Sequence, residues 1–245
     1  LARTFHALAY SILKAEGHNP LLLSGPEQEG WIRQLVDGVQ WPAELQPALH
    51  TRGFIRELRD LILRATERGW TPEDLEQNGV EYKEEFWVAA SAFWKSYIGT
   101  LILVDANHGE PKERLDSAQL VWRAANVTRN TFKNQFKTIL VDKFQESDKA
   151  QRALLQNIAT DDLVIAVDPY STVGRFRGAD PDGLADALSP YLSKGDSIHL
   201  NENFRASSAV HLFLQKVAGE FPKAPEIQSS RGEIAGSVVA DCFID

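Results

Sequence analysis

The sequence predicts an α/β protein in which a parallel sheet is interrupted by a large all-helical block. Beyond residue 138, short apolar strands alternate with helices, a pattern typical of parallel sheets with right-handed crossovers. Between residues 24 and 117, by contrast, the apolar residues recur at helical spacing. Two of the later strands end in an acid, Asp142 and Asp168, at the sheet edge where α/β proteins usually hold ligands.

The helical part begins with an opening helix over residues 3–15, whose apolar residues follow the helical period. Proline or capping residues and glycines then delimit further helices at 24–38, 51–68, 71–79, 81–103 and 118–127. The fourth of these carries a dense set of aromatic residues, among them Phe93, Trp94 and Tyr97. We expect these side chains to pack between helices as a core.

The later part alternates strands and helices. Strands are predicted at 139–141, 163–167, 198–200 and 238–244. Helices are predicted at 150–158, 183–192 and 207–219. Either Ser147 or Asp148 could cap the first of these helices.

Composition limits the classes of function. The 245 residues carry a net charge of −8, so any contact with DNA requires a local basic patch. The single cysteine, Cys242, excludes an internal disulfide and a cysteine-based zinc site, and it fits a reducing cytoplasm. No uninterrupted apolar run is long enough to cross a bilayer and no signal peptide is visible, so we expect no membrane.

Four stretches, in order, carry a resemblance to a known family. They read RTFHALAYSIL (3–13), TILVDKFQESDKAQ (138–151), DPYSTVGRFRGAD (168–180) and IHLNENFRASSAV (198–210). They resemble the UvrD/Rep-type superfamily 1 DNA helicases, which carry T-F-H-x-L, V-D-E-F-Q-D-T-D-x-A-Q, G-D-P-D-Q-S-I-Y-R-F-R-G-A-D and N-Y-R-S. The segments between them look like the actinobacterial AdnA and AdnB helicase–nuclease subunits, and AdnA in particular.

The resemblance implies a P-loop NTPase (RecA-like) fold in a cytoplasmic bacterial protein, with four parts. Residues 1–23 would belong to the first motor domain and include a helix on the DNA path. Residues 24–135 would form the helical insertion, 136–196 the rest of the first motor domain, and 197–245 the start of a truncated second one.

The resemblance also implies residue roles. Six residues would contact single-stranded DNA by phosphate bonds or base stacking: Thr4, Phe5, His6, Arg175, Phe176 and Arg177. The family uses ATP and Mg²⁺, and four residues would bind them: Asp142 as the acid linked to Mg²⁺, Gln145, Asp168 and the γ-phosphate arginine Arg205. A Gly-rich phosphate loop is absent from the sequence, and we expect it to precede Leu1.

Three of the departures from the family motifs concern hydrolysis or DNA stacking. Lys143 stands where the family has the catalytic Glu that orients the attacking water, Ser171 replaces the Gln that senses the γ-phosphate, and Gly174 replaces an aromatic residue that stacks on DNA. A cation cannot accept the water's proton, and losing a positioned base costs roughly 10²–10⁴-fold in rate. We therefore expect hydrolysis to be lost.

Three interpretations of function follow. The first is a DNA-binding subunit of a helicase–nuclease that processes double-strand breaks, whose partners are duplex-end or single-stranded DNA and another, ATP-driven subunit. The second is an active ATP-dependent 3′-to-5′ helicase in which Glu146 or Asp148 replaces the lost base. The third is a protein-interaction scaffold that binds neither ATP nor DNA, so that changing Phe176 would leave DNA affinity unaltered.

Overall fold

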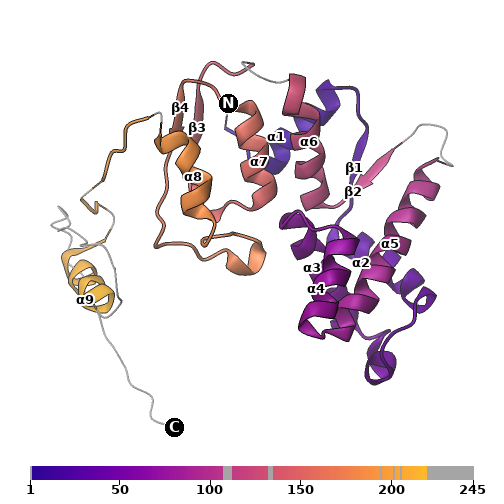
Figure 1. Ribbon diagram of the computed structural model, residues 1–245. Helices are drawn as coiled ribbons and strands as arrows, with labels where there is room; N and C mark the ends of the chain where they lie inside the picture. The colour runs from indigo at the N-terminus through magenta and orange to yellow at the C-terminus, as the bar shows by residue number, and fades with distance from the viewer. Residues whose placement is uncertain are drawn as a thin grey trace, which may run out of the picture. The chain divides into compact units, whose positions relative to one another are not determined.

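The computed structural model describes residues 2–106, 112–131, 135–193, 195–200, 202–204 and 206–219, with the backbone alone for 129–131 (Figure 1). The chain divides into two units, 1–184 and 185–245, each of which is described by itself. Arg205, Cys242 and the strand predicted at 238–244 lie outside the described residues.

Helices dominate the described residues, and the strands are short. In chain order the elements are α1 (Phe5–Ala15), β1 (Pro20–Leu22), α2 (Gly25–Leu35), the 3₁₀ turns η1 (Val36–Gly38) and η2 (Ala43–Ala48), α3 (Arg52–Glu67), α4 (Pro72–Tyr82), α5 (Glu85–Ala106), β2 (Glu113–Leu115), α6 (Ser117–Thr131), β3 (Ile139–Val141), η3 (Phe144–Glu146), α7 (Lys149–Ile158), β4 (Leu163–Ile165), η4 (Arg175–Arg177), α8 (Leu184–Leu192) and α9 (Ser208–Gly219).

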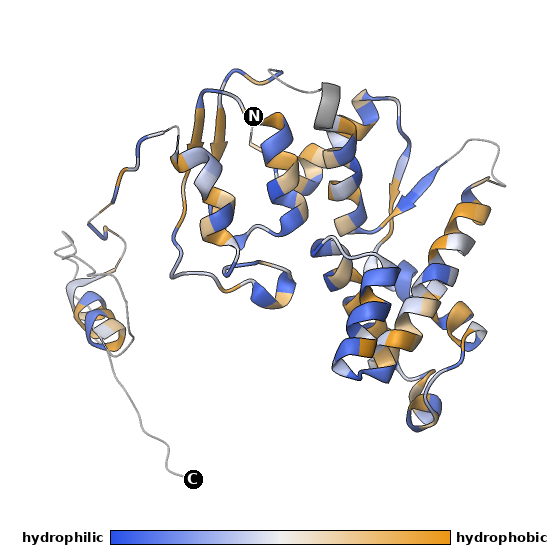
Figure 2. Ribbon diagram, in the orientation of Figure 1, coloured by the Kyte–Doolittle hydropathy of each residue, from blue (hydrophilic) through white to orange (hydrophobic). Residues whose placement is uncertain are grey.

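Two pairs of parallel strands are present among the described residues. The predicted pairing of the strands before Asp142 and Asp168 is confirmed: β3 and β4 are apolar throughout and run parallel, with Ile139 opposite Leu163 (Figure 2). The strand predicted at 198–200 is wrong. That segment has no regular structure, and Ile198 and Leu200 are 85% and 92% exposed. An apolar pattern alone does not make a strand where no neighbour supplies hydrogen bonds.

The second pair, β1 with β2, corrects the prediction that residues 24–117 are entirely helical. Glu113 lies opposite Pro20, and its carboxylate contacts His18 Nδ1 at 2.6 Å and Arg123 Nε at 3.1 Å. The charged residues of β2 do not resemble a strand, because this strand is set by its partner and by these ion pairs and not by its own propensity.

A core of aromatic and aliphatic side chains holds α2 to α5 together. Trp41 packs edge-on against Phe54 with ring centroids 5.1 Å apart, and its Nε1 donates to Val36 O at 2.6 Å. Phe93, Trp94 and Tyr97 are buried in the same core, as predicted.

The helix predicted from residue 81 begins later, at Glu85. The capping box at Thr71 starts α4 at the next residue, and α4 runs on to Tyr82. It ends because Lys83 adopts a left-handed conformation, φ 59°, and Glu84 N then bonds Gly79 O at 2.8 Å. The assignment of residues 24–135 as an inserted subdomain stays a prediction, as do the other domain boundaries.

The helix α6 connects this core to the strand-end region. It packs against α1 and α7, where Asn157 Nδ2 donates to Ala125 O at 2.6 Å (Figure 1). It also contacts α3, because Trp122 Nε1 donates to Thr66 O at 2.6 Å. The C-terminal end of α3 is thereby held beside the elements that carry the candidate site.

The length and composition of α5 would allow this helix to span a membrane. Three of its residues, Ala90, Phe93 and Trp94, are at most 3% exposed within the helical core. This part of the helix packs in the core, for which an apolar composition is expected, whereas Ile102 and Leu103 near its end are 62% and 66% exposed.

Candidate functional site

The candidate site is built on the ends of β3 and β4. Ala166 N donates to Val141 O at 2.8 Å and Phe144 N to Ala166 O at 3.1 Å, which extends the pairing past both strands. Asp142 and Lys143 are therefore presented at the strand end, where both are exposed. Lys143 has φ 53°, a left-handed conformation that marks a sharp turn out of the strand.

Asp142 fits the role of a Mg²⁺ ligand, because its exposed carboxylate is the oxygen donor that this ion prefers. Within the described parts of the chain, no cluster of three or more His, Cys, Asp or Glu side chains could hold a metal ion by itself. Any Mg²⁺ here would thus depend on phosphate oxygens and water for most of its ligands.

Gln145 is buried and both ends of its amide have partners in the protein. Its Nε2 donates to Ser171 Oγ at 3.0 Å, and its Oε1 accepts from Asp168 N at 3.1 Å. The side chain thus fastens the loop after β4 to the turn after β3. Each end of the amide keeps one further hydrogen-bonding position, and the role of Gln145 as a nucleotide ligand stays a prediction.

Asp168 is exposed three residues beyond the end of β4, because the strand predicted at 163–167 ends at Ile165. Its Oδ1 accepts from Tyr170 N at 3.1 Å, and its carbonyl accepts from Ser171 N at 3.2 Å. The structure therefore places Asp142 and Asp168 at the same edge of a parallel pair, with Asp168 partly engaged in its own turn.

The two carboxylates considered as substitute bases are engaged elsewhere. Glu146 Oε1 accepts from Val173 N at 2.9 Å. Asp148 is buried, and its Oδ1 caps α7 by accepting from Gln151 N at 2.8 Å. Burial raises the pKa of Asp148, an effect that the capping bond opposes only in part. Neither carboxylate is free at the strand end.

The residues predicted to contact DNA near the N-terminus lie at the start of α1. Thr4 is the N-cap: its hydroxyl accepts from Ala7 N at 3.2 Å, and the helix begins at Phe5 and not at residue 3. Phe5 and His6 are half-buried. His6 is one of the groups that oppose the rise in the pKa of Asp148, which burial causes.

The arginine-flanked aromatic forms the 3₁₀ turn η4. Phe176 is 72% exposed, and the Arg177 guanidinium lies over its ring, 5.1 Å from the centroid. Arg175 Nη2 contacts both carboxylate oxygens of Asp182 at 3.0 Å. An exposed ring beside two guanidinium groups can stack on a base and hold a phosphate.

Sequence reasoning missed two buried charged residues next to this turn. Arg152 Nε donates to Ser147 Oγ at 3.0 Å and its Nη2 to Asp180 O at 2.7 Å. Glu67, at the end of α3, forms an ion pair with Arg64 and is 7% exposed. No local sequence pattern predicts the burial of either residue, because both are covered by segments far away in the sequence.

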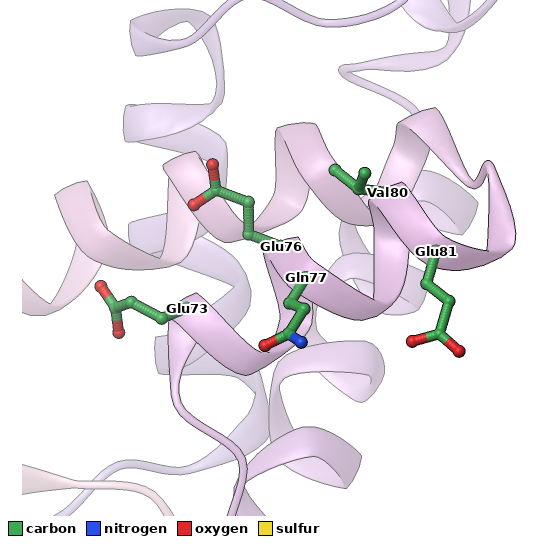
Figure 3. A pocket seen from close by; sticks show the side chains of 5 residues that line it. All are labelled: Glu73, Glu76, Gln77, Val80 and Glu81. Atoms are coloured by element: carbon green, nitrogen blue, oxygen red, sulfur yellow. The ribbon is translucent and has the colours of Figure 1, made fainter.

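A surface cavity lies elsewhere, on α4. Figure 3 shows that Glu73, Glu76, Gln77, Val80 and Glu81 line it. Lys95 contacts Glu73 at 3.4 Å and Glu76 at 2.8 Å. Three carboxylates would repel a phosphate, and none of the predicted site residues lines this cavity.

The burial of Glu67 gives a prediction for pH. Burial raises the pKa of its carboxyl to about 8, and the Arg64 guanidinium opposes the rise only in part. The folded protein therefore keeps this proton up to about pH 8, whereas the unfolded chain releases it near the ordinary value of 4.5. We expect the free energy of unfolding to fall as the pH rises between these values, by at most about 1.4 kcal/mol per pH unit.

Urea denaturation of the parent and of Glu67→Gln at several pH values checks this. The amide does not titrate, so Glu67→Gln should remove this part of the decline, whereas Glu44→Gln, a change of an exposed carboxylate, should leave it intact. An identical decline in the parent and in Glu67→Gln would contradict the prediction.

Parallel strands followed by acids beside an arginine-flanked aromatic turn are consistent with the P-loop NTPase fold that the sequence resemblance implies. The family comparison agrees. The chain belongs to the UvrD/REP helicase N-terminal domain family, whose sequence profile matches residues 1–191.

Individual relatives are similar at low identity. The chain is 23% identical over 216 residues to DNA helicase II of Escherichia coli K12, which covers 84% of this chain and 28% of that protein. It is 31% identical over 95 residues to an ATP-dependent helicase/nuclease subunit of Staphylococcus haemolyticus, covering 35% of this chain and 8% of that protein. It is 21% identical over 222 residues to the ATP-dependent DNA helicase PcrA of Staphylococcus epidermidis, covering 84% of this chain and 28% of that protein. The chain thus spans less than a third of these relatives.

Proposed function

We propose that this chain is the DNA-binding motor part of a hydrolysis-defective, AdnA-like subunit of a bacterial helicase–nuclease that acts in DNA repair. A second subunit would supply ATP-driven translocation, and the substrate would be single-stranded or duplex-end DNA. The place of action would be the cytoplasm. ATP and Mg²⁺ are the cofactors of the family, and Asp142 is the residue here that suits the metal.

The observation that carries this proposal is the chemistry at the end of β3. The exposed residue after Asp142 is the cation Lys143, and the nearby carboxylates of Glu146 and Asp148 are bonded to backbone N–H groups. The position after Asp142 thus offers no carboxylate to take a proton from water, and the two carboxylates considered as substitutes are each already bonded. The exposed turn η4, in contrast, keeps both arginines and the aromatic ring.

The alternative of an active helicase needs Glu146 or Asp148 as the base. Glu146 would have to leave Val173 N, and Asp148 would have to leave the N-terminus of α7 and a buried position. Each step costs a hydrogen bond, so the geometry favours the hydrolysis-defective protein. A measurement of DNA binding distinguishes the scaffold from the proposed DNA-binding subunit, because the scaffold would not bind DNA.

The test is the affinity for a single-stranded oligonucleotide, measured by fluorescence anisotropy at fixed salt. We expect Phe176→Ala to weaken binding by roughly 1–3 kcal/mol, the typical contribution of one base stacked on an aromatic ring. We expect Arg177→Gln to reduce the salt dependence of binding, because one fewer phosphate is neutralised.

The matched control is Tyr82→Ala, which removes another exposed aromatic ring, 62% exposed, from α4. It should leave affinity unchanged. Equal affinities of the parent, Phe176→Ala and Tyr82→Ala would contradict a role of the turn in DNA binding and would favour the scaffold.

A further inference from the structure

The turn η4 is bounded by two glycines, and a glutamate carboxylate is packed against each of them. A Cβ added to Gly174, which precedes the turn, would overlap Oε2 of Glu146. A Cβ added to Gly178, which follows it, would overlap Oε2 of Glu67. The two carboxylates come from η3 and from the end of α3, so the turn lies between two separate elements.

Glu146 is fixed where it lies. Its other oxygen, Oε1, accepts from Val173 N at 2.9 Å. The carboxylate therefore spans the peptide before Gly174, with one oxygen bonded to the backbone and the other filling the space of a side chain. Because Gly174 has φ −88° and ψ 14°, alanine could adopt its backbone conformation, and only the carboxylate stands in the way.

Glu67 is fixed as well. It is 7% exposed and its carboxyl contacts Arg64, whose Nη1 would lie 3.1 Å from a Cβ at Gly178. Gly178 has φ 88°, a conformation that glycine adopts without strain. At this end, the turn thus needs glycine both for its backbone conformation and for the close approach of Glu67.

We propose that Glu146 is a positioning residue that clamps the turn Arg175–Arg177 through its bond to Val173 N and its packing against Gly174, with Glu67 packed against the other end at Gly178, and so holds Phe176 outward. The benefit of the clamp rests on the proposed DNA-binding function, whereas the contacts that form the clamp do not depend on it. A surface aromatic on a mobile loop would lose conformational entropy when a base stacks on it. A turn held at both ends has already lost that freedom, so the ring is presented to a base at lower cost.

The clamp at Gly174 is tested by native-state cleavage with trypsin, which cuts after Arg175 and Arg177. Removing either partner, by Glu146→Ala or by Gly174→Ala, should speed cleavage at these two sites by roughly 2- to 12-fold, the effect of losing one hydrogen bond on local opening. Adding Gly174→Ala to Glu146→Ala should have no further effect, because the obstructing carboxylate is gone. Mass spectrometry identifies the sites, and Glu44→Ala serves as the control.

Two results would overturn the clamp. One is unchanged cleavage in both single variants while urea denaturation shows that they remain folded. The other is a double variant whose increase is the product of the two single increases, because independent sites multiply and a shared contact does not.

The DNA affinities of the same proteins separate this inference from the proposed function. If the parent binds the oligonucleotide, Gly174→Ala should weaken binding and should no longer do so in the Glu146→Ala background. If the parent binds no DNA while the cleavage pattern is as expected, the proposed function fails and the clamp stands. If the parent binds DNA but the single variants change neither affinity nor cleavage, the proposed function stands and the clamp is refuted.

Discussion

The protein should hydrolyse no ATP above background, with or without single-stranded DNA and in the absence of any partner. The reason lies at the end of β3, where Lys143 stands in place of a base and the carboxylates of Glu146 and Asp148 are held by backbone N–H groups. Loss of a positioned base lowers the rate by roughly 10²–10⁴-fold, and a positive charge at the same place should lower it no less.

Phosphate release measures this, beside a variant that carries Lys143→Glu and Ser171→Gln. The matched control is Lys149→Glu, which makes the same change of charge on an exposed lysine at the start of α7. We expect the parent and the control to be equally inactive. Gain of turnover in the double variant would localise the defect to these two positions. Robust turnover in the parent would overturn the hydrolysis-defective function.

Arg152→Ala should destabilise the protein by roughly 3–5 kcal/mol, the effect of breaking a buried, hydrogen-bonded charge network. The side chain is 6% exposed, and its guanidinium lies 5.6 Å from the centre of the Phe144 ring. It bonds Ser147 Oγ and Asp180 O, so it ties the start of α7 to the segment after η4. Its removal would leave Asp180 without this partner and an unfilled space in the interior.

Urea denaturation measures the loss of unfolding free energy, with the dependence of that free energy on urea concentration fitted separately for each variant. Arg123→Ala is the matched control, because Arg123 also pairs with a carboxylate, Glu113, but is 48% exposed. Exposed pairs contribute at most about 1 kcal/mol. Equal effects of the two substitutions would contradict the structural importance of Arg152.

The sequence predicted those parts of the fold that depend on neighbouring residues. The capping boxes that begin with Ser24 and Thr71 start α2 and α4 where expected. Of the two candidate caps for α7, Asp148 is the one observed. The pairing of β3 with β4 was also predictable, because consecutive apolar strands joined by a helix pair in parallel.

The site was predictable only in its outline. The motifs placed Asp142 and Asp168 at one sheet edge and made the arginine-flanked turn recognisable. They did not reveal that the side chains of Gln145 and Glu146 both bond the loop after β4. A motif fixes the type and order of residues, but their hydrogen-bond partners come from other segments.

The sequence by itself thus determined the family, the helix starts and the presence of a lysine in place of the catalytic acid. Only the tertiary structure decided that Glu113 belongs to a strand, that Glu67 is buried and that Gly174 and Gly178 each lie against a carboxylate. The physical reason is range. Caps and periodicity act over one or two helical turns, whereas strand pairing, burial and close packing are set by residues that meet only when the chain has folded.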